Sequence, residues 1–257
     1  MRILFLGNNL TGLRILEFLR SRDEEVCAAV IHPPDRCRFG NEIIRASGLP
    51  PERIFDGSQL GTEQAIRSIR ELKPDIGISA FFGYILRPEL IAIMEYGCIN
   101  IHPAYLPFNR GAHPNVWCIL DGTPAGVTIH YIDSGVDTGD IITQRKVEVD
   151  PVDTGGSLYA KLERECLRLF EESWPIIRSG GPPRIPQRPG EGAFHRLSDL
   201  QKTDEIDPDK TYKGSELINL IRARTFPPYR GVYFRHNGRK IYLRLSLLQE
   251  DEEASDE

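Results

Sequence analysis

The sequence has 257 residues, 40% of them hydrophobic and 27% charged, which is typical of a soluble globular protein and excludes disordered and fibrous classes. The net charge is −5 at pH 7, but residues 249–257 carry six acidic side chains and no basic one, so the remaining chain has a net charge of +1. Because nucleic-acid-binding proteins usually show a strong basic excess, we expect no nucleic-acid partner.

The first half of the chain alternates short apolar runs with amphipathic segments. We expect strands at 2–6, 26–31, 76–80 and 98–101, and helices at 10–20, 64–72, 88–94 and 114–120. The apolar runs are continuous rather than alternating, which is typical of strands that are buried on both faces of a parallel sheet. The pattern predicts a Rossmann-like α/β domain with a mostly parallel sheet, over about residues 1–180.

After residue 121 the pattern favours β structure, followed by one long helix. Apolar runs predict strands at 125–131 and 141–149, and Asp153-Thr154 is expected to cap the helix. One face of this helix is apolar every fourth residue and is predicted to join the core, at Leu158, Leu162, Cys166, Phe170 and Trp174.

The C-terminal part is predicted to be a separate, small α+β module. Residues 179–190 are rich in glycine and proline and are expected to form a linker. Residues 191–248 are predicted to hold one helix, at 214–224, and a β-hairpin that turns at Asn237-Gly238. Since a two-stranded ribbon is marginally stable alone, we expect this hairpin to pair two copies in a homodimer. The acidic end, 249–257, is expected to be a disordered tail.

The sequence also bears on the location of the protein. The apolar run at 2–6 is too short for a signal peptide, and no run approaches the roughly 20 residues that span a bilayer, so we expect no membrane partner. The cysteines are odd in number and scattered, which argues against a disulfide framework and a structural zinc site and favours a cytoplasmic location. They are Cys27, Cys37, Cys98, Cys118 and Cys166.

A glycine turn, residues 7–12, connects the first strand to the first helix. It lacks both the G-x-G-x-x-G spacing of a dinucleotide fingerprint and the lysine of a phosphate-binding loop. Free N–H groups at a helix N-terminus can still hold an anion. A substrate anion near Asn8 and Asn9 and a purely structural tight turn therefore both stay open.

Two polar residues stand out in the apolar strand at 98–101. Asn100 and His102 are two residues apart, so their side chains project to the same face. Pro103 ends the strand and places His102 at its carboxyl end, where open parallel sheets bind their ligands. This pairing favours a functional site over a structural histidine.

A second polar segment follows the strand at 125–131. Its aspartates, Asp133, Asp137 and Asp140, would suit a calcium or magnesium loop by their charge, but the spacing does not match an EF-hand. An acid–base pair of His102 and Asp137 is the better use of these residues, because a carboxylate raises the pKa of an imidazole and holds its tautomer.

Several of these motifs together resemble the folate-dependent formyltransferase family. They are Asn100-x-His102, the segment from Leu106 to Pro114 that contains Arg110-Gly111-Ala112, and His130 followed seven residues later by Asp137. The segments that begin at Phe82, Asn109 and Arg222 resemble the sugar N-formyltransferase branch. The resemblance covers about residues 1–180.

The resemblance implies a reaction, its two substrates and a catalytic trio. The implied donor is N10-formyltetrahydrofolate, and the implied acceptor is a nucleotide-linked amino sugar, typically a dTDP-4-amino-4,6-dideoxyhexose used in O-antigen or other surface glycans. Asn100, His102 and Asp137 are implied as the catalytic residues, with Asn100 donating to the oxyanion of the tetrahedral intermediate. His102 would act as acid or base, and no metal is required.

The binding residues implied by the resemblance fall into two groups. The pterin of the donor is expected to lie against Phe82, Gly83, Tyr84, Ile85 and Leu86, together with Asp133. The acceptor is expected to contact Arg110 through its pyrophosphate and an aromatic side chain through its base. The full expected acceptor set is Asn8, Asn9, Tyr105, Asn109, Arg110, Phe226 and Tyr229.

Four alternatives stay open. A methionyl-tRNA formyltransferase would carry a larger basic C-terminal domain, because tRNA binding depends on phosphate neutralisation. A purine transformylase would lack the module at 191–248. A non-catalytic binding protein would retain the fold without the chemistry, and a metal-dependent hydrolase would need a bound divalent ion.

Overall fold

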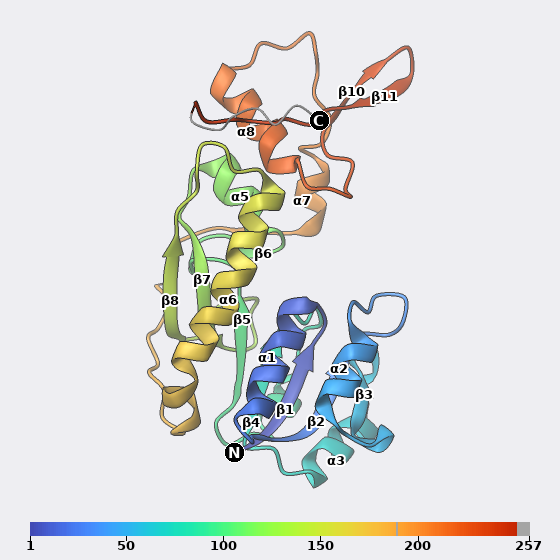
Figure 1. Ribbon diagram of the computed structural model, residues 1–257, viewed down its shortest axis with the longest axis vertical. Helices are drawn as coiled ribbons and strands as arrows, with labels where there is room; N and C mark the ends of the chain where they lie inside the picture. The colour runs from blue at the N-terminus through green and yellow to red at the C-terminus, as the bar shows by residue number, and fades with distance from the viewer. Residues whose placement is uncertain (189, 251–257) are drawn as a thin grey trace.

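The computed structural model describes residues 1–188 and 190–250 and is built around a seven-stranded sheet (Figure 1). The strand order is β3-β2-β1-β4-β5-β7-β8. Strands β1 to β5 run parallel, whereas β7 is antiparallel to both β5 and β8. This confirms the predicted mostly parallel sheet. The strands are β1 (Arg2–Gly7), β2 (Glu25–Ile31), β3 (Ile54–Asp56), β4 (Ile76–Ala80), β5 (Cys98–His102), β7 (Ala125–Tyr131) and β8 (Ile141–Val147).

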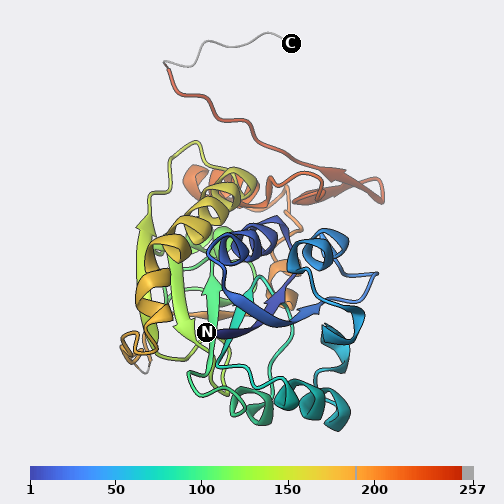
Figure 2. The same cartoon turned by 60° about the horizontal axis from the view of Figure 1, so that its bottom comes forward.

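Helices cover both faces of the sheet, as Figure 2 shows. On one face lie α1, α2 and α6, with α5 packed against α6 and β7. The opposite face is covered by α3 and α4. The helices of the domain are α1 (Leu10–Ser21), α2 (Gly40–Ser47), α3 (Glu63–Glu71), α4 (Pro88–Ile91), α5 (Pro114–Asp121) and α6 (Gly155–Arg178).

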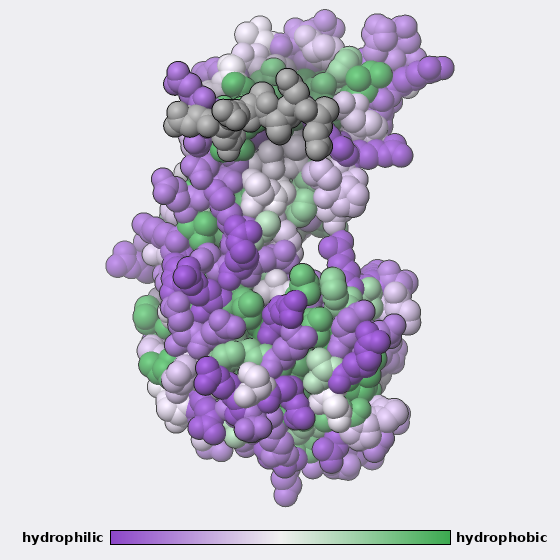
Figure 3. Space-filling model, in the orientation of Figure 1, coloured by the Kyte–Doolittle hydropathy of each residue, from purple (hydrophilic) through white to green (hydrophobic). Residues whose placement is uncertain are grey.

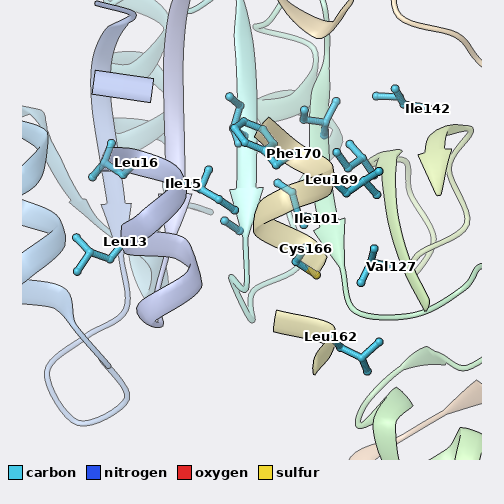
Figure 4. Packing of buried hydrophobic residues seen from close by; sticks show 14 of the residues in the cluster. Leu13, Ile15, Leu16, Ile101, Val127, Ile142, Leu162, Cys166, Leu169 and Phe170 are labelled. Carbon is cyan, nitrogen blue, oxygen red and sulfur yellow. The ribbon is translucent and has the colours of Figure 1, made fainter. Parts of the chain in front are cut away.

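Each face of the sheet has its own apolar core. In the larger core, side chains of α1 and α6 pack on the sheet near Ile101 of β5 and Val127 of β7 (Figure 4). The smaller core lies under α3 and α4 and includes Ile69 and Leu90. All five predicted apolar positions of α6 are buried, which confirms that this helix face belongs to the core.

Local capping sets the start of α1 and α6, the two helices that pack on the larger core. The Asn9 side chain accepts a hydrogen bond from the Gly12 N–H at 3.0 Å and begins α1. Thr154 and Ser157 form a reciprocal capping box at the start of α6, so a helix start at the predicted cap is confirmed.

Some elements differ from the sequence-based expectation. Helix α4 ends at Ile91, three residues before the expected end, and continues as turns towards Gly97, which has a positive φ of 72°. Strand β8 ends at Val147 rather than at residue 149. Helix α2, strand β3 and the 3-10 helices Pro51–Arg53 and Gly57–Gln59 were not expected, because elements of three to eight residues show too little hydrophobic periodicity.

The segment after α6 is more tightly joined to the domain than a linker and a separate module would be. Strand β9 (Phe194–His195) pairs with β6 (Arg110–Gly111), and Ile185 bridges to Ile141. Two helices follow rather than one, α7 (Leu197–Gln201) and α8 (Gly214–Arg224). The hairpin, β10 (Tyr233–His236) and β11 (Arg239–Tyr242), is present as predicted.

The C-terminal part is anchored to the domain by a buried arginine and by the shared core. The guanidinium of Arg222, on α8, donates to the backbone carbonyls of Asp150, Pro151 and Asp153 at 2.9–3.2 Å. Leu200 and Ala223 belong to the larger core. Residues 251–257 of the expected acidic tail lie outside the described residues. Within the described part of the chain, no helix is long and apolar enough to cross a membrane.

Candidate active site

A row of three polar side chains crosses the middle of the sheet. Ser79 on β4, Asn100 on β5 and His130 on β7 are register neighbours. The Ser79 hydroxyl donates to Asn100 Oδ1 at 2.9 Å, and Asn100 Nδ2 lies 3.3 Å from His130 Nε2. The row therefore fixes the amide of Asn100, with its oxygen towards β4 and its nitrogen towards β7.

His130 is held in one ring orientation. Its Nδ1 lies 2.8 Å from the Tyr131 carbonyl oxygen, and the side chain is buried. Because a carbonyl can only accept, Nδ1 must carry a proton, and in the neutral ring Nε2 is then an acceptor for Asn100. Sequence analysis gave His130 no role in the site. The signal was there, since it is a polar residue in a run that is otherwise apolar.

Asp137 lies next to both histidines. Its Oδ2 is 3.5 Å from His102 Nε2, and its Oδ1 is 3.4 Å from His130 Nε2. The Gly111 N–H donates to Oδ2 at 3.0 Å, which orients the carboxylate. The structure thus brings the predicted trio of Asn100, His102 and Asp137 together, and Asn100 Nδ2 lies 3.5 Å from Asp137 Oδ1.

The loop that carries Asp137 is tied down by the segment expected to be a linker. The side-chain amide of Gln187 donates to the carbonyls of Asp137 and Gly139, at 2.9 and 2.8 Å. Asp137 has a positive φ of 53°, and a Cβ on Gly139 would lie 1.9 Å from the Tyr131 carbonyl oxygen. The carboxylate is therefore presented by a loop with little conformational freedom. The sequence around Asp137 does not indicate that Gln187, 50 residues further along the chain, holds this loop.

Burial and charge set the protonation of the pair. Burial lowers the pKa of His102 below its ordinary value, and the Asp137 carboxylate opposes this shift without cancelling it. Burial alone would raise the pKa of Asp137, but the two histidines and the Gly111 N–H hold it well below its usual range. At neutral pH the site therefore holds an ionised Asp137 and a neutral His102, whose Nε2 has no hydrogen-bond partner among the described residues.

These side chains line a single cavity of about 530 Å³, a size that suits a bound organic substrate. Its lining includes the segment Phe82–Leu86, the trio, Arg38 and the rings of Tyr159, Phe226 and Tyr229. Figure 3 shows a notch on the side of the molecule where, in Figure 1, the connection between β2 and α2 faces the C-terminal part.

Comparison with known families identifies this fold and site. The model for "Formyl transferase" matches residues 1–172, and the model for "N-formyltransferase dimerization C-terminal domain" matches residues 199–249. The chain belongs to the formyl transferase family. The family expected from the motifs is thereby confirmed, as is the Rossmann-like formyltransferase fold.

Relatives of this formyltransferase come from two branches. It is 32% identical over 254 residues to a methionyl-tRNA formyltransferase of Geotalea daltonii, covering 94% of this chain and 78% of that protein. A 4-N formyltransferase from Francisella tularensis has 29% identity and a TM-score of 0.81, with 96% and 98% of the two chains covered. The formyltransferase of Anoxybacillus kamchatkensis, solved with UDP-4,6-dideoxy-4-formamido-L-AltNAc and tetrahydrofolate, has 35% identity, a TM-score of 0.60 and coverage of 79% and 89%.

The residues predicted to bind the donor all lie on the cavity of the formyltransferase. Phe82, Gly83, Tyr84, Ile85, Leu86 and Asp133 are all among its lining residues. Ile85 is 78% exposed, so an apolar side chain faces solvent beside the cavity, whereas Leu86 is buried. The Asp133 carboxylate accepts from the Gly135 N–H and the Thr138 hydroxyl. Their roles in binding remain predictions.

The residues predicted to bind the acceptor are only partly on the cavity. Phe226 and Tyr229 line it, whereas the other five predicted residues are not among its lining residues. The Asn8 side chain accepts from the Arg38 N–H, Asn9 caps α1, and Asn109 donates to Thr123.

Arg38 was not predicted, and it is the arginine among the lining residues of the cavity. Arg110, which was expected in this role, lies on β6 and is not among the lining residues of the cavity. Tyr105 is likewise off the cavity, where its ring meets the Lys146 ammonium at 5.3 Å. Arg38 follows two consecutive prolines, Pro33 and Pro34, and no motif surrounds it, so sequence patterns alone did not favour it over Arg110.

The aspartates considered for a metal loop have separate partners. Asp137 faces the histidines, Asp133 closes its own turn, and Asp140 lies 3.8 Å from Arg184. Among residues 1–188 and 190–250, no group of three or more histidine, cysteine, aspartate or glutamate side chains is arranged to hold a metal ion.

Proposed function

We propose that this formyltransferase moves a formyl group from N10-formyltetrahydrofolate to the amino group of a nucleotide-linked amino sugar. The observation that carries the proposal is that the Phe82–Leu86 segment, the trio, Arg38 and an aromatic cluster all line one cavity. The Anoxybacillus relative, solved with a formamido nucleotide sugar and tetrahydrofolate, supports both substrates. We infer a dTDP-linked 4-amino-4,6-dideoxyhexose as the acceptor, used in lipopolysaccharide or another surface glycan.

The reaction requires one bond to form and one to break at the formyl carbon. The sugar amine attacks this carbon and forms a C–N bond, and the carbonyl oxygen becomes an oxyanion. Collapse of the intermediate breaks the bond to N10 of the folate, which takes up a proton as it leaves. The proton lost by the amine thus balances the proton gained by N10, and a group on the protein must carry it.

His102 is the group that accepts this proton. Its pKa is lowered by burial, so the ring is neutral at physiological pH and acts first as a base. Once protonated, its Nε2 lies 3.5 Å from the ionised Asp137, so the charge pair exists only after proton transfer has begun. Such an interaction stabilises the transition state more than the ground state, as catalysis requires.

Asn100 is placed to stabilise the oxyanion. Its amide oxygen is engaged by Ser79, so its nitrogen is the end presented to the reacting carbon. The contact between Nδ2 and Asp137 Oδ1 is 3.5 Å, which is at the limit of a hydrogen bond. This N–H can therefore turn to a developing negative charge at small cost, and one such donor is worth on the order of 10²–10³ in rate.

Arg38 and the aromatic cluster suit the nucleotide end of the acceptor. The rings of Tyr159, Phe226 and Tyr229 are in sequential contact, with centroids 5.3 and 5.4 Å apart. The Arg38 guanidinium donates to the Tyr229 hydroxyl at 2.9 Å. A planar guanidinium matches phosphate oxygens and aromatic faces stack on a base, so this end fits a nucleoside diphosphate.

We further propose that two copies of the formyltransferase associate through the C-terminal hairpin. The matched dimerization domain contains β10 and β11. Ile241 and Tyr242 on β11 remain partly exposed, together with Leu248 beyond it. Light scattering at micromolar concentration tests this: the wild type should have twice the mass of the chain, and Ile241→Glu should be a monomer. A monomeric wild type would refute the proposal.

We further propose that the enzyme works in the cytoplasm.

A turnover assay tests the main proposal. Purified protein is incubated with N10-formyltetrahydrofolate and a panel of dTDP- and UDP-linked 3- and 4-amino sugars, and mass spectrometry detects the gain of one formyl group. His102→Asn is the blank. Product from one sugar, absent with the blank, supports the proposal. Because a 32% identical relative is a methionyl-tRNA formyltransferase, charged initiator tRNA is included, and product from tRNA alone would overturn the sugar assignment.

A further inference from the structure

His32 lies directly behind the proposed donor-binding segment. It follows β2, is 8% exposed and does not line the cavity. Its Nε2 accepts a hydrogen bond from the Gly83 N–H at 3.1 Å. This contact ties the end of β2 to the loop after β4, two segments that are 51 residues apart in the sequence.

The ring of His32 also packs against the residues on both sides of Gly83. Its centroid lies 5.0 Å from that of Phe82 and 4.9 Å from that of Tyr84, both in edge-on geometry. Gly57 closes the cluster from another side, since a Cβ there would lie 2.8 Å from the Phe82 ring and 3.0 Å from the Tyr84 ring. The segment is therefore clamped by one imidazole through two rings and one hydrogen bond.

The hydrogen bond orients more of the backbone than the Gly83 N–H. The peptide group is planar, so fixing this N–H also fixes the direction of the Phe82 carbonyl, which points the opposite way. A pterin carries a row of donors and acceptors along one edge, and backbone groups of this segment can match that row only in a set orientation. We propose that His32 is a positioning residue for the folate donor: it holds the backbone of residues 82–84 in the orientation that binds the pterin.

This inference rests on the proposed function, since it takes residues 82–86 as the donor site. It also implies a dependence on pH, because only a neutral Nε2 can accept the Gly83 N–H. The charged or titratable groups around His32 are Arg36, Asp56, Cys37 and Tyr84. Burial and the Arg36 charge lower the pKa of His32, and Asp56 opposes them. The bond is thus intact at neutral pH and breaks as the solution is made acidic.

Two substitutions separate the ring contacts from the hydrogen bond. His32→Phe keeps an aromatic ring against Phe82 and Tyr84 but has no acceptor. His32→Gln has a side-chain oxygen that reaches the position of Nε2, and it does not titrate. The exposed His236 of the hairpin gives a matched control, His236→Phe. Thermal unfolding of each variant shows whether it is folded.

The experiment is calorimetric titration of the full chain with 5-formyltetrahydrofolate, a stable analogue of the donor, at pH 7.5 and pH 5.5. At pH 7.5 we expect Kd to rise about fivefold to tenfold in His32→Phe, as for the loss of one buried hydrogen bond, and to stay within twofold of wild type in His32→Gln and His236→Phe. Acidification should weaken binding more in wild type than in His32→Gln. Donor KM should follow Kd, whereas kcat should change little.

The outcomes distinguish the two levels of the proposal. If the wild type binds 5-formyltetrahydrofolate and His32→Phe binds it equally well, the positioning role is wrong while the proposed function stands. If acidification weakens binding in wild type by the same factor as in His32→Gln, the titration of His32 is not the cause. If the wild type binds no folate at all, the donor assignment fails, and the role of His32 fails with it.

Discussion

Replacing Asp137 by asparagine removes one negative charge and little else. The amide has the shape of the carboxylate, and its oxygen can still accept from the Gly111 N–H, which lies 3.0 Å from Oδ2 in the native protein. What is lost is the charge 3.5 Å from His102 Nε2. In the proposed mechanism this charge stabilises the imidazolium that forms when His102 takes the proton of the amine.

The size of the effect follows from the distance. Two unit charges 3.5 Å apart interact by about 5 kcal/mol at an effective dielectric constant of about 20. Partial charge transfer in the transition state and reorientation of the neighbouring dipoles reduce this to about 2–3 kcal/mol. At about 1.4 kcal/mol for each factor of ten, Asp137→Asn should lower kcat/KM by about 30-fold to 150-fold.

The pH dependence of Asp137→Asn relative to wild type also follows from the contact between Asp137 and His102. Asp137 raises the pKa of His102 against the effect of burial, so its removal lowers that pKa further. A histidine that protonates at lower pH is a weaker base, and the acidic limb of the kcat/KM profile should move to lower pH while the plateau falls.

The assay is initial-rate product formation by mass spectrometry between pH 4.5 and 9, for wild type and Asp137→Asn. The control is Asp140→Asn, on the same loop, whose carboxylate faces Arg184 and not the histidines. The reasoning is refuted if Asp137→Asn retains more than about a fifth of the activity while folded, or if its acidic limb moves to higher pH.

Three further predictions concern the site and the fold. In wild type the acidic limb of kcat/KM should have its midpoint below pH 6.5, because burial lowers the pKa of His102 and the neutral ring is the active form. Gln187→Ala should lower kcat about tenfold with a smaller change in KM, since it frees the carbonyls of Asp137 and Gly139 from their shared donor. Arg222→Met should cost about 3 kcal/mol of unfolding free energy, measured in urea, because it leaves three carbonyls without their donor.

Each of these has an outcome that contradicts it. A midpoint above pH 6.5 would mean that His102 acts first in its protonated form. A Gln187→Ala enzyme with unchanged kcat would mean that the Asp137 loop keeps its conformation without the Gln187 hydrogen bonds. For Arg222→Met, the matched control is Arg164→Met, at an exposed position of α6, and equal stability of the two variants would refute the anchoring role.

The sequence located the centre of the site but not its surroundings. Asn100 and His102 were found because side-chain alternation and Pro103 together place them on one face at a strand end. Asp137 was found through the chemistry that a histidine needs and through the resemblance. Ser79 and His130 were not given a role, because they join Asn100 only through the order of β4, β5 and β7 and the register between them. Register is a property of paired strands, and no single strand contains it.

The same distinction holds for the fold and the binding residues. The sequence by itself determined the α/β alternation, the apolar face of α6, the Asn237-Gly238 hairpin and the position of Asn100 and His102 on one face of a strand end, because each is encoded by local periodicity, turn chemistry or strand position. Only the tertiary structure decided that Arg38 rather than Arg110 faces the cavity, that Gln187 holds the Asp137 loop, and that His32 supports Gly83. The contacts of Gln187 and His32 join residues that are 48 to 51 positions apart, and the choice of Arg38 over Arg110 is between two similar side chains, so tertiary packing decides each of them.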